Sequence, residues 1–331
     1  MSVHNSPPLL RVENLKTHLT LKRGVVRAVD GVSLTVAEGE TLGIVGESGS
    51  GKTMTCLSIL RLLPNTGEQS ITGTIELDGT DLLGLTEEQM ARDWRGRRIS
   101  MVSQDPLTSL NPVFTIGDQV GGPFRYHRLA HGRAGVRAAV ANVLRRVRIP
   151  SPEKRLDDYP HQFSGGMRQR VCSAMAIACE PRLLIADEPT SNLDVTIQVQ
   201  MMDLFRDIQA ETGVGIILIT HDLGVAAGIC HRVAVMYAGR VVEVGDVRAI
   251  YRRPAHPYTR ALLDSIPRLG QRRRRLYSIA GQPPSLIAPP EGCRFAARCT
   301  RAEARCHESY PPEVEISSGH SVACWLPLEA T

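Results

Sequence analysis

The feature that most constrains this chain is a glycine-rich segment, residues 46–53, which reads GESGSGKT. It fits the pattern G-x-x-x-x-G-K-[ST] at every position. The apolar run at residues 41–45 predicts a buried strand before it, and residues 54–63 predict a helix after it, which Pro64 ends. Because a strand, a glycine turn and a helix in this order are typical of phosphate-binding loops, we expect an α/β fold.

The chemistry of phosphate binding explains the residue types in this loop. Glycines let the backbone curl so that several N–H groups point at one phosphate, and the following helix adds its positive end. Lys52 is expected to bridge the β- and γ-phosphates of ATP, and the Thr53 hydroxyl to bind Mg²⁺. The candidate contact residues are Gly46, Ser48, Gly49, Ser50, Gly51, Lys52 and Thr53.

A second predicted strand supplies carboxylates. Residues 183–188 read LLIADE, so the apolar run sets Asp187 at the carboxyl end of a strand, where ligands bind in open α/β sheets. Asp187 is expected to hold Mg²⁺, directly or through water, and Glu188 to deprotonate or orient the attacking water. Such a strand end alone could simply face solvent, but together with the loop it predicts ATP hydrolysis.

Four further motifs resemble those of the ABC ATPases in order and spacing. Residues 163–170 read FSGGMRQR and resemble the signature motif LSGGQ. Gln104 resembles the glutamine of the Q-loop, residues 191–194 (SNLD) resemble the D-loop, and His221 resembles the histidine of the H-loop. With the two phosphate-site motifs, six elements therefore match across residues 40 to 222.

The resemblance implies a P-loop ABC ATPase core, with a mixed sheet in a RecA-like lobe and a helical subdomain at about residues 105–180. It also implies a head-to-tail dimer, in which the signature helix of one chain faces the ATP held by the other. His221 would hold the γ-phosphate, and Gln104 would bind Mg²⁺ and sense the attacking water. The further nucleotide-contacting residues that it implies are Ser164, Gly165, Gly166 and Asp194.

The sequence departs from the family pattern in two ways. Phe163 and Met167 replace leucine and glutamine in the signature, while the Ser-Gly-Gly core is intact, so we expect activity. Family members often stack adenine on an aromatic residue upstream of the loop, and that position falls near Arg23. An arginine plane can also stack on a base, so Arg23 is the candidate for this contact.

The end of the chain differs in texture, and we predict a nucleotide-binding domain over residues 1–255 and an extension over 256–331. Residues 251–259 read YRRPAHPYT and resemble the C-terminal extension of oligopeptide, dipeptide and nickel importer ATPases, in particular the D-type subunit. The resemblance implies uptake of di- or oligopeptides across the cytoplasmic membrane. The implied partners are an F-type ATP-binding subunit, two transmembrane permease subunits and an extracytoplasmic substrate-binding protein. The permeases would dock near the Q-loop and helical region, at about residues 104–165.

Two alternative functions remain open. An ABC importer ATPase for nickel or another small solute would carry the same motifs. A soluble ABC ATPase of DNA repair or translation would usually contain a long coiled coil or two cassettes. The 135 residues between Lys52 and Asp187 leave no room for a long coiled coil, and one cassette is present.

The extension contains four clustered cysteines, Cys293, Cys299, Cys306 and Cys324. Zinc ribbons normally use C-x₂-C pairs, which this cluster lacks. The importer resemblance implies a [4Fe–4S] cluster at these thiols, with zinc and free thiols as the alternatives. The other four, expected to be small buried hydrophobic residues, are Cys56, Cys172, Cys179 and Cys230.

Charge and hydropathy predict a chain that neither crosses a membrane nor binds nucleic acid. The formal net charge of +5 is mild, its one dense basic run (residues 272–275) is expected to be a solvated linker, and no nucleic-acid partner is expected. No segment approaches the roughly 20 apolar residues that span a bilayer, and the first ten residues do not resemble a secretory signal. We therefore expect the chain to remain in the cytosol, and the importer resemblance implies a peripheral position on the cytoplasmic face of the membrane, held by permease subunits.

Overall fold

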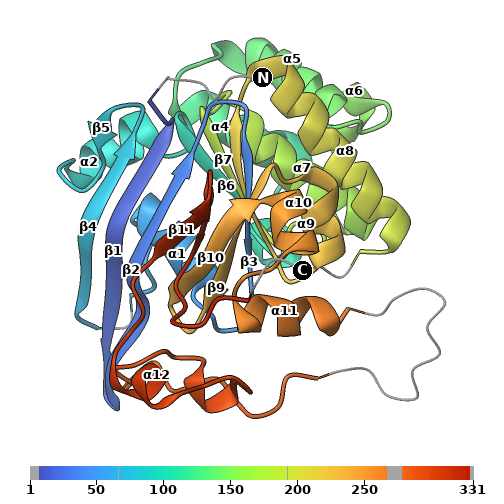
Figure 1. The fold of residues 1–331 in the computed structure, drawn as a ribbon. Coiled ribbons are helices and arrows are strands. Elements are labelled where there is room, and N and C mark those ends of the chain that lie inside the picture. The colour runs from blue at the N-terminus through green and yellow to red at the C-terminus, as the bar shows by residue number, and fades with distance from the viewer. Residues whose placement is uncertain (1–6, 66, 192, 267–277, 329–331) are drawn as a thin grey trace. The chain divides into compact units, whose positions relative to one another are not determined.

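The computed structural model describes residues 7–65, 67–191, 193–266 and 278–328 (Figure 1). Asn192 of the D-loop and the basic run at residues 272–275 lie outside the described residues. The chain divides into two compact units. Unit 1 takes its described residues from Met1–Leu9, Val36–Glu40 and Leu82–Leu218, and unit 2 from Leu10–Thr35, Thr41–Asp81 and Ile219–Thr331.

Unit 1 combines helices with parallel strands. Its strands lie in the order β8-β7-β6, and β6 pairs in parallel with β7, with Ile99 opposite Leu183 and Val102 opposite Ala186. Strand β8 begins in this unit and ends in unit 2. The elements are α2 (Glu87–Gln89), a π-helical turn η1 (Met90–Trp94), β6 (Ile99–Val102), α3 (Pro106–Ser109), α4 (Ile116–Tyr126), α5 (Gly132–Arg146), α6 (Pro152–Arg155), a 3-10 turn η2 (Pro160–Gln162), α7 (Gly165–Ile177), β7 (Leu183–Asp187), α8 (Val195–Thr212) and β8 (Gly215–Thr220).

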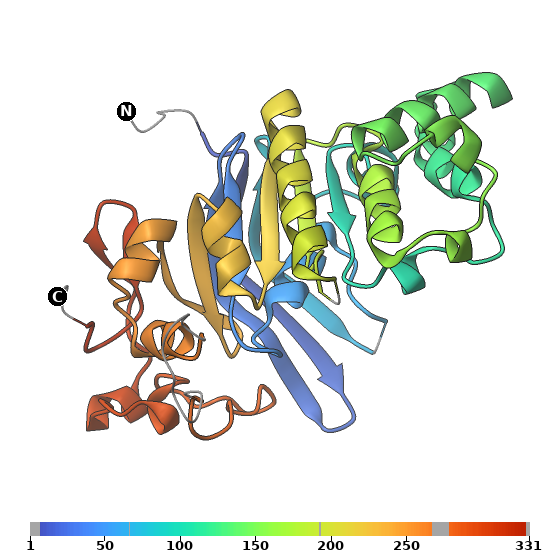
Figure 2. The same ribbon diagram turned by 90° about the vertical axis from the view of Figure 1, so that its right-hand side faces the viewer.

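The helices of unit 1 bury the apolar faces that their sequence spacing predicts. In α5, Val136, Val140, Val143 and Leu144 recur at helical spacing and are all buried. Helices α4, α5 and α7 contact one another, and Figure 2 shows them as the green group. This group lies within the predicted helical subdomain.

Unit 2 contains an antiparallel sheet and most of a mixed one. The first has the order β2-β1-β4-β5, and the second contributes β11-β12-β10-β9-β3. The elements are β1 (Leu10–Leu21), β2 (Gly24–Val36), β3 (Thr41–Val45), α1 (Lys52–Leu60), β4 (Gln69–Leu77), β5 (Thr80–Asp81), α9 (Leu223–Ile229), β9 (Arg232–Tyr237), β10 (Arg240–Asp246), α10 (Val247–Arg252), α11 (Pro257–Asp264), a 3-10 turn η3 (Ala296–Arg298), α12 (Ala304–Glu308), β11 (Val314–Ser317) and β12 (His320–Val322).

Strand β3 supports the glycine-rich loop. All five of its residues are buried, and it pairs in parallel with β9, with Val45 opposite Val235. A Cβ atom at Gly43 would lie 2.7 Å from the Cys230 sulfur, so glycine allows α9 to approach this strand closely. The loop therefore leaves a strand that is fixed by packing on its neighbours.

The C-terminal extension, orange to red in Figure 1, is built into unit 2. Its strand β12 pairs antiparallel with β10, with Val322 opposite Glu243. The buried Glu243 carboxylate lies 2.8 Å from the His320 ring and accepts the backbone N–H groups of Ala255 and His256. The predicted domain boundary near residue 255 thus falls at this junction inside unit 2, and it stays a prediction.

The mixed α/β class is as predicted from the sequence. Strand β3 has the bounds that its apolar run predicts, and the signature motif begins helix α7. The helix predicted over residues 54–63 is α1, which begins at Lys52 and ends at Leu60. The sheet is mixed, because β3 pairs in parallel with β9 while β9 and β10 pair antiparallel. Strands β2, β4, β5, β10, β11 and β12 were not predicted.

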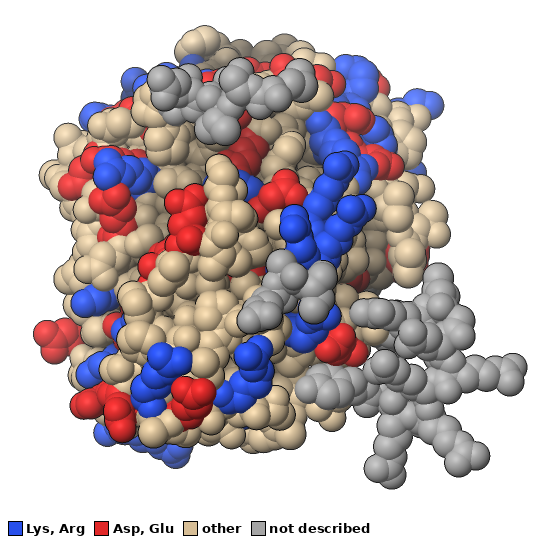
Figure 3. Space-filling view, in the orientation of Figure 1, with Lys and Arg blue, Asp and Glu red and all other residues tan. Residues whose placement is uncertain are grey.

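Within the parts of the chain that the structure describes, no helix combines the length and apolarity needed to cross a membrane. On the face shown in Figure 3, basic and acidic side chains are interspersed among uncharged ones.

Candidate functional site

The glycine-rich loop of unit 2 has the backbone that the motif predicts. Gly46, Gly49 and Gly51 have φ angles of 152°, 77° and 105°, a region that other L residues rarely adopt. A Cβ atom at Gly46 would lie 2.2 Å from the carbonyl oxygen of Met236, and one at Gly51 would lie 2.5 Å from that of Ala28. Side chains at these two positions would therefore collide with backbone that cannot move aside cheaply.

The start of α1 and the side chains around it suit an anion. No side chain caps this helix at Gly51, so its first N–H groups can face a ligand. The Lys52 ammonium donates to the carbonyl oxygens of Gly46 (2.9 Å) and Glu47 (3.0 Å). The buried Ser50 hydroxyl has no hydrogen-bond partner. A phosphate here would give that hydroxyl an acceptor and Lys52 a stronger partner than a carbonyl, so the loop fits the predicted ligand.

The remaining predicted contact residues of unit 2 lie at exposed positions. Ser48 and Thr53 are exposed on the loop and in the first turn of α1. His221 is exposed directly after β8, and Arg23 is exposed in the turn between β1 and β2. Their assignments to phosphate, Mg²⁺ and adenine stay predictions.

In unit 1, two of the predicted catalytic residues meet. Asp187 is the last residue of β7 and is buried, and Glu188 follows it, half-buried, with a φ of 45°. The Gln104 side-chain amide donates to Glu188 Oε2 at 3.1 Å, across 84 positions of sequence. A left-handed glutamate costs backbone energy, and such strain concentrates at functional sites. Asp187 supplies the carboxylate oxygen that Mg²⁺ prefers.

The signature segment begins a helix as predicted. Ser164 is the N-cap of α7, and its hydroxyl accepts the Met167 N–H at 3.4 Å. Ser164 and Gly165 are exposed, whereas a Cβ atom at Gly166 would lie 2.9 Å from Ile197 Cγ2. The second glycine thus lets α7 pack on α8, while the exposed start of the helix leaves room for an anion.

Asp194 has a structural role that the sequence-based assignment did not include. It is the N-cap of α8, and its carboxylate accepts the Ile197 N–H at 2.9 Å. The neighbouring Ser191 hydroxyl donates to the Glu188 carbonyl oxygen at 2.9 Å. The D-loop therefore bonds the turn that carries Glu188, and a nucleotide contact by Asp194 stays a prediction.

The four cysteines of the extension line one cavity of about 20 Å³, together with His256, Phe295 and Trp325. Burial raises the pKa of Cys293, Cys299 and Cys324, the last to about 11, so these thiols are protonated at neutral pH. Two of the sulfurs accept backbone N–H groups at 3.4 Å, Cys299 from Arg301 and Cys324 from Leu326. The donor set suits a four-cysteine site, but the cavity holds about one water, so the surrounding loops would have to move apart.

The metal expectation is not met as the structure stands. Among the described residues, no group of three or more His, Cys, Asp or Glu side chains is placed to hold a metal ion. The arrangement as it stands therefore supports neither zinc nor a [4Fe–4S] cluster.

The other four cysteines behave as small apolar residues, as predicted. Cys56, Cys172 and Cys230 are buried, and Cys179 is half-buried. Burial raises the pKa of Cys172 and Cys230 to about 12 and that of Cys179 to about 11, which keeps the thiols neutral.

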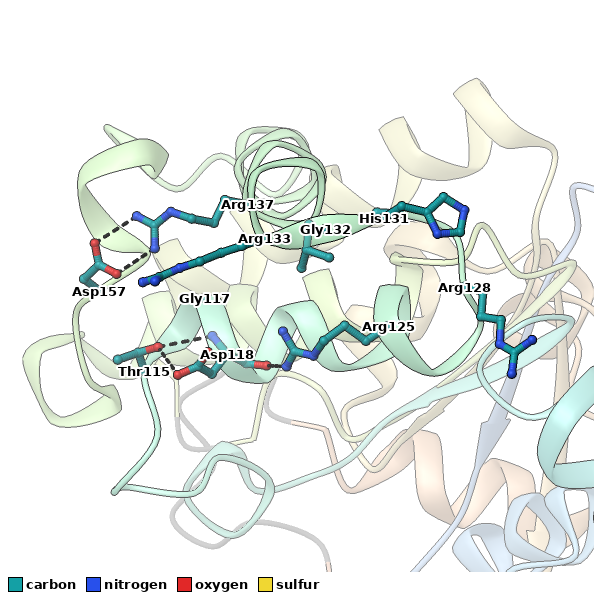
Figure 4. A pocket seen from close by; sticks show the side chains of 12 residues that line it. Thr115, Gly117, Asp118, Arg125, Arg128, His131, Gly132, Arg133, Arg137 and Asp157 are labelled. Atoms are coloured by element: carbon teal, nitrogen blue, oxygen red, sulfur yellow. Dashed lines mark hydrogen bonds and ion pairs between the residues drawn. The ribbon is translucent and has the colours of Figure 1, made fainter.

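Unit 1 also contains an open pocket of about 660 Å³ beside α4 and the start of α5 (Figure 4). Arg137 forms a two-bond ion pair with Asp157, at 2.7 and 2.9 Å, and Arg133 points toward the same end of the pocket. Arg125 and Arg128 line the other end. Four arginines against two aspartates make the pocket basic, and it lies within the predicted docking region of residues 104–165.

The sequence-based assignment missed Glu47 and Arg298 as a pair. Glu47 belongs to the loop motif, and Arg298 lies between the clustered cysteines Cys293 and Cys299, 251 positions away. Tyr258, which was noted only as part of the extension motif, accepts the Glu47 N–H with its hydroxyl at 2.9 Å. No local pattern could have connected these three residues.

Comparisons with known families match two regions of the chain. The profile described as "ABC transporter" matches residues 29–191, and the profile "Oligopeptide/dipeptide transporter, C-terminal region" matches residues 242–306.

Curated relatives match over almost the full length. The dipeptide transport ATP-binding protein DppD of Bacillus subtilis is 50% identical, over 96% of this chain and 94% of that protein. The oligopeptide transport ATP-binding protein OppD of Haemophilus influenzae is 44% identical, over 97% of this chain and 98% of that protein.

Solved structures show the same fold. The dimeric ATP-binding cassette MJ0796, in a post-hydrolysis state bound to ADP and Pi, has a TM-score of 0.64 and is 26% identical, covering 72% of this chain and 99% of that chain. CbiO1 from Clostridium perfringens, part of the ABC transporter complex CbiONQ, has a TM-score of 0.62 and is 27% identical, covering 74% and 91%.

Proposed function

This chain is an ATP-hydrolysing member of the ABC transporter family, and from that premise we propose that it couples MgATP hydrolysis to uptake of di- or oligopeptides across the cytoplasmic membrane. The observation that carries the proposal is the pairing, in one chain, of an ABC core with the oligopeptide/dipeptide transporter C-terminal region. The names of the full-length relatives, which concern dipeptide and oligopeptide transport, support the same choice of cargo.

The proposal gives each motif a role in hydrolysis. The loop of residues 46–53 and the start of α1 bind the phosphates, with Lys52 on the β- and γ-phosphates. Thr53, Asp187 and Gln104 would supply the oxygen ligands of Mg²⁺. The ion would neutralise negative charge on the phosphates. Glu188 accepts a proton from the attacking water, and Gln104 fixes the Glu188 carboxylate by its 3.1 Å hydrogen bond.

The signature helix has no phosphate to bind within its own chain under this proposal. Ser164 and Gly165 are exposed at the start of α7, which suits a ligand brought by a second ATP-binding subunit. We assign that place to a related F-type subunit in a head-to-tail dimer. The solved relative MJ0796 is itself a dimer.

The docking surface for the permease subunits is assigned to the loop after α3. Val113 and Phe114 are 71% and 52% exposed. The Gln119 side chain accepts the Asn111 N–H at 2.8 Å and donates to the Asn111 and Phe114 carbonyl oxygens at 3.0 and 2.9 Å. Because these hydrogen bonds fix the loop, Val113 and Phe114 stay exposed to solvent. Exposed apolar side chains on a fixed loop are typical of an interaction site.

The basic pocket of Figure 4 adjoins this loop in sequence, because Thr115 lines it. We therefore expect a cytoplasmic permease segment that offers an apolar residue to Phe114 and an acidic one to the pocket. Peptide delivery to the permeases falls to an extracytoplasmic substrate-binding protein.

The proposal predicts membrane association that depends on Phe114. Co-expressed with its two permease subunits, the full chain should sediment with membranes and hydrolyse ATP in response to peptide-loaded binding protein. Phe114→Asp should lose most of both, because it places a charge in an apolar contact, while its MgATP affinity stays unchanged. Cell fractionation and phosphate release measure the two effects.

A matched control is Val314→Asp, which changes a 47% exposed apolar residue on β11. It should sediment and respond to peptide as the wild type does. If the wild-type chain stays in the soluble fraction with both permeases present, the importer assignment is wrong. If Phe114→Asp behaves as the wild type, the docking surface lies elsewhere.

For the cysteine cavity we propose a [4Fe–4S] cluster. The support is the set of four thiols around one cavity and the N–H groups directed at two sulfurs, since such bonds accompany cluster ligands. The cluster would hold together a segment that has few apolar residues of its own. The thiols must lose their protons to bind iron. In the metal-free chain, burial of these thiols favours their protonated form and therefore opposes assembly of the cluster.

Metal analysis tests this assignment. Chain purified anaerobically should contain about four irons and four acid-labile sulfides, and Cys293→Ser or Cys306→Ser should lose them. Cys56→Ser, at a buried thiol outside the cavity, is the control and should retain them. About one zinc per chain would replace the cluster by a structural zinc site, and metal-free protein would mean free thiols.

A further inference from the structure

The C-terminal extension reaches the phosphate loop and holds it at a single residue, Glu47. The Glu47 carboxylate accepts two hydrogen bonds from the Arg298 guanidinium, at 2.7 Å to Oε2 and 3.0 Å to Oε1. The Glu47 backbone N–H donates to the Tyr258 hydroxyl at 2.9 Å. Both the side chain and the main chain of the second loop residue are therefore bonded to the extension.

Arg298 is held more completely than an ordinary surface arginine. A guanidinium has five N–H donors, and all five have acceptors here. Besides the two bonds to Glu47, they donate to the Tyr237 hydroxyl (3.1 Å) and to the carbonyl oxygens of Ala280 (3.0 Å) and Ile279 (3.3 Å). The side chain is only 5% exposed, against 26% for Glu47. This burial and full pairing fix the geometry of the contact, whereas an exposed ion pair is free to separate.

An aromatic cluster fixes the position of the arginine. The ring of Tyr237 lies 4.6 Å from that of Tyr258 and 5.3 Å from that of Phe295, and the rings of Tyr258 and Phe295 are 5.3 Å apart. The Arg298 guanidinium carbon lies 5.7 Å from the centre of the Tyr237 ring. Since Tyr237 ends β9, the cluster joins the extension to the strand next to β3.

The charge of Glu47 explains why such a contact would matter. A carboxylate in a phosphate loop opposes the binding of an anion, and this effect is large when the carboxylate has no cation beside it. Arg298 neutralises the carboxylate and draws it toward the extension. The Glu47 carbonyl oxygen accepts a hydrogen bond from Lys52. Arg298 therefore bonds the side chain of Glu47, and Lys52 bonds its main chain.

We propose that Arg298 is a positioning residue of the nucleotide site, through which the C-terminal extension sets the affinity of the phosphate loop for MgADP and MgATP. The inference rests on the proposed function in that the loop binds nucleotide. It adds that the extension is part of the nucleotide site in this chain. Cys299 follows Arg298 directly, so the turn that brings the arginine to the loop also brings a thiol to the cysteine cavity.

The experiment measures MgADP affinity of the full chain by calorimetry in four variants. Arg298→Ala should weaken affinity about ten- to a hundredfold, because it leaves a charged, partly buried carboxylate unpaired in the loop. Adding Glu47→Gln to Arg298→Ala should recover part of that loss, since the opposing charge is then gone. Glu47→Gln alone should lose less than Arg298→Ala does. Arg298→Lys should fall between wild type and Arg298→Ala, because it keeps the charge but not the two-bond geometry.

The recovery in the double variant separates positioning from simple support of the fold. If Arg298 only stabilised the extension, removing Glu47 as well would bring no recovery, and that result would overturn the proposal. Arg305→Ala is the matched control, because Arg305 lies in the same extension and bonds Glu303 and the Trp325 carbonyl instead of the loop. It should bind MgADP as the wild type does.

Two further comparisons keep the test decisive. If Arg298→Ala does not fold, as judged by thermal unfolding, Arg298→Lys carries the test, and wild-type affinity in that variant would contradict the proposal. Lys52→Ala distinguishes the two levels of inference. If it loses MgADP while Arg298→Ala does not, only the role of Arg298 fails, whereas unchanged affinity in Lys52→Ala means that the loop itself is misassigned.

Discussion

Glu188→Gln is expected to bind MgATP about as tightly as the wild type and to hydrolyse it about 10²- to 10⁴-fold more slowly, the usual contribution of a general base. The amide has the shape of the carboxylate and can still bond Gln104, but it cannot accept the proton of the attacking water. With hydrolysis blocked, ATP should hold two subunits together. Phosphate release measures the rate, and light scattering with and without ATP measures the dimer.

Glu180→Gln is a close control for this experiment. Glu180 also has a left-handed backbone, with a φ of 52°, but its carboxylate pairs with Arg146 on the surface of unit 1. The same chemical change in the same backbone conformation should leave hydrolysis unchanged, because exposed pairs contribute little. Wild-type turnover in Glu188→Gln would mean that another group activates the water.

The parts of the fold that could be predicted are those with local signals. A continuous apolar run gave β3 its bounds because every residue of this strand is buried. The serine before two glycines correctly marked the start of α7, where Ser164 caps the helix. The loop glycines could be recognised because each has a positive φ angle that other residues rarely adopt. This requirement acts on each position separately, so a sequence motif can record it.

What could not be predicted depends on pairing between distant segments. Strand β12 adds to β10 through residues such as Val322 and Glu243, and nothing near either residue indicates its partner. The Glu47–Arg298 pair is a stronger case, because it alters the electrostatics of the phosphate loop from 251 positions away. The role of Asp194 as a helix cap was missed because the family resemblance suggested a nucleotide contact first.

Lys52→Ala is expected to abolish measurable nucleotide binding, a loss of at least about a hundredfold. The Lys52 ammonium is the only positively charged group of the loop that can bind a phosphate. The other charged side chain of the loop, Glu47, is negative and forms an ion pair with Arg298. In the structure Lys52 bonds the carbonyl oxygens of Gly46 and Glu47, so alanine also removes two bonds that shape the loop. Both effects act in the same direction.

Thermal unfolding with and without MgATP separates lost binding from lost folding. A ligand that binds the native state raises the unfolding temperature by an amount that grows with the logarithm of its affinity, so the wild type should shift and Lys52→Ala should not. Lys154→Ala, at an exposed lysine of α6, should shift as the wild type does. If Lys52→Ala unfolds at the temperature of the ligand-free wild type, the loop survives without its lysine and the loss lies in phosphate recognition. A lower temperature would assign part of the loss to the two carbonyl bonds, and a full MgATP shift would move the nucleotide site away from this loop.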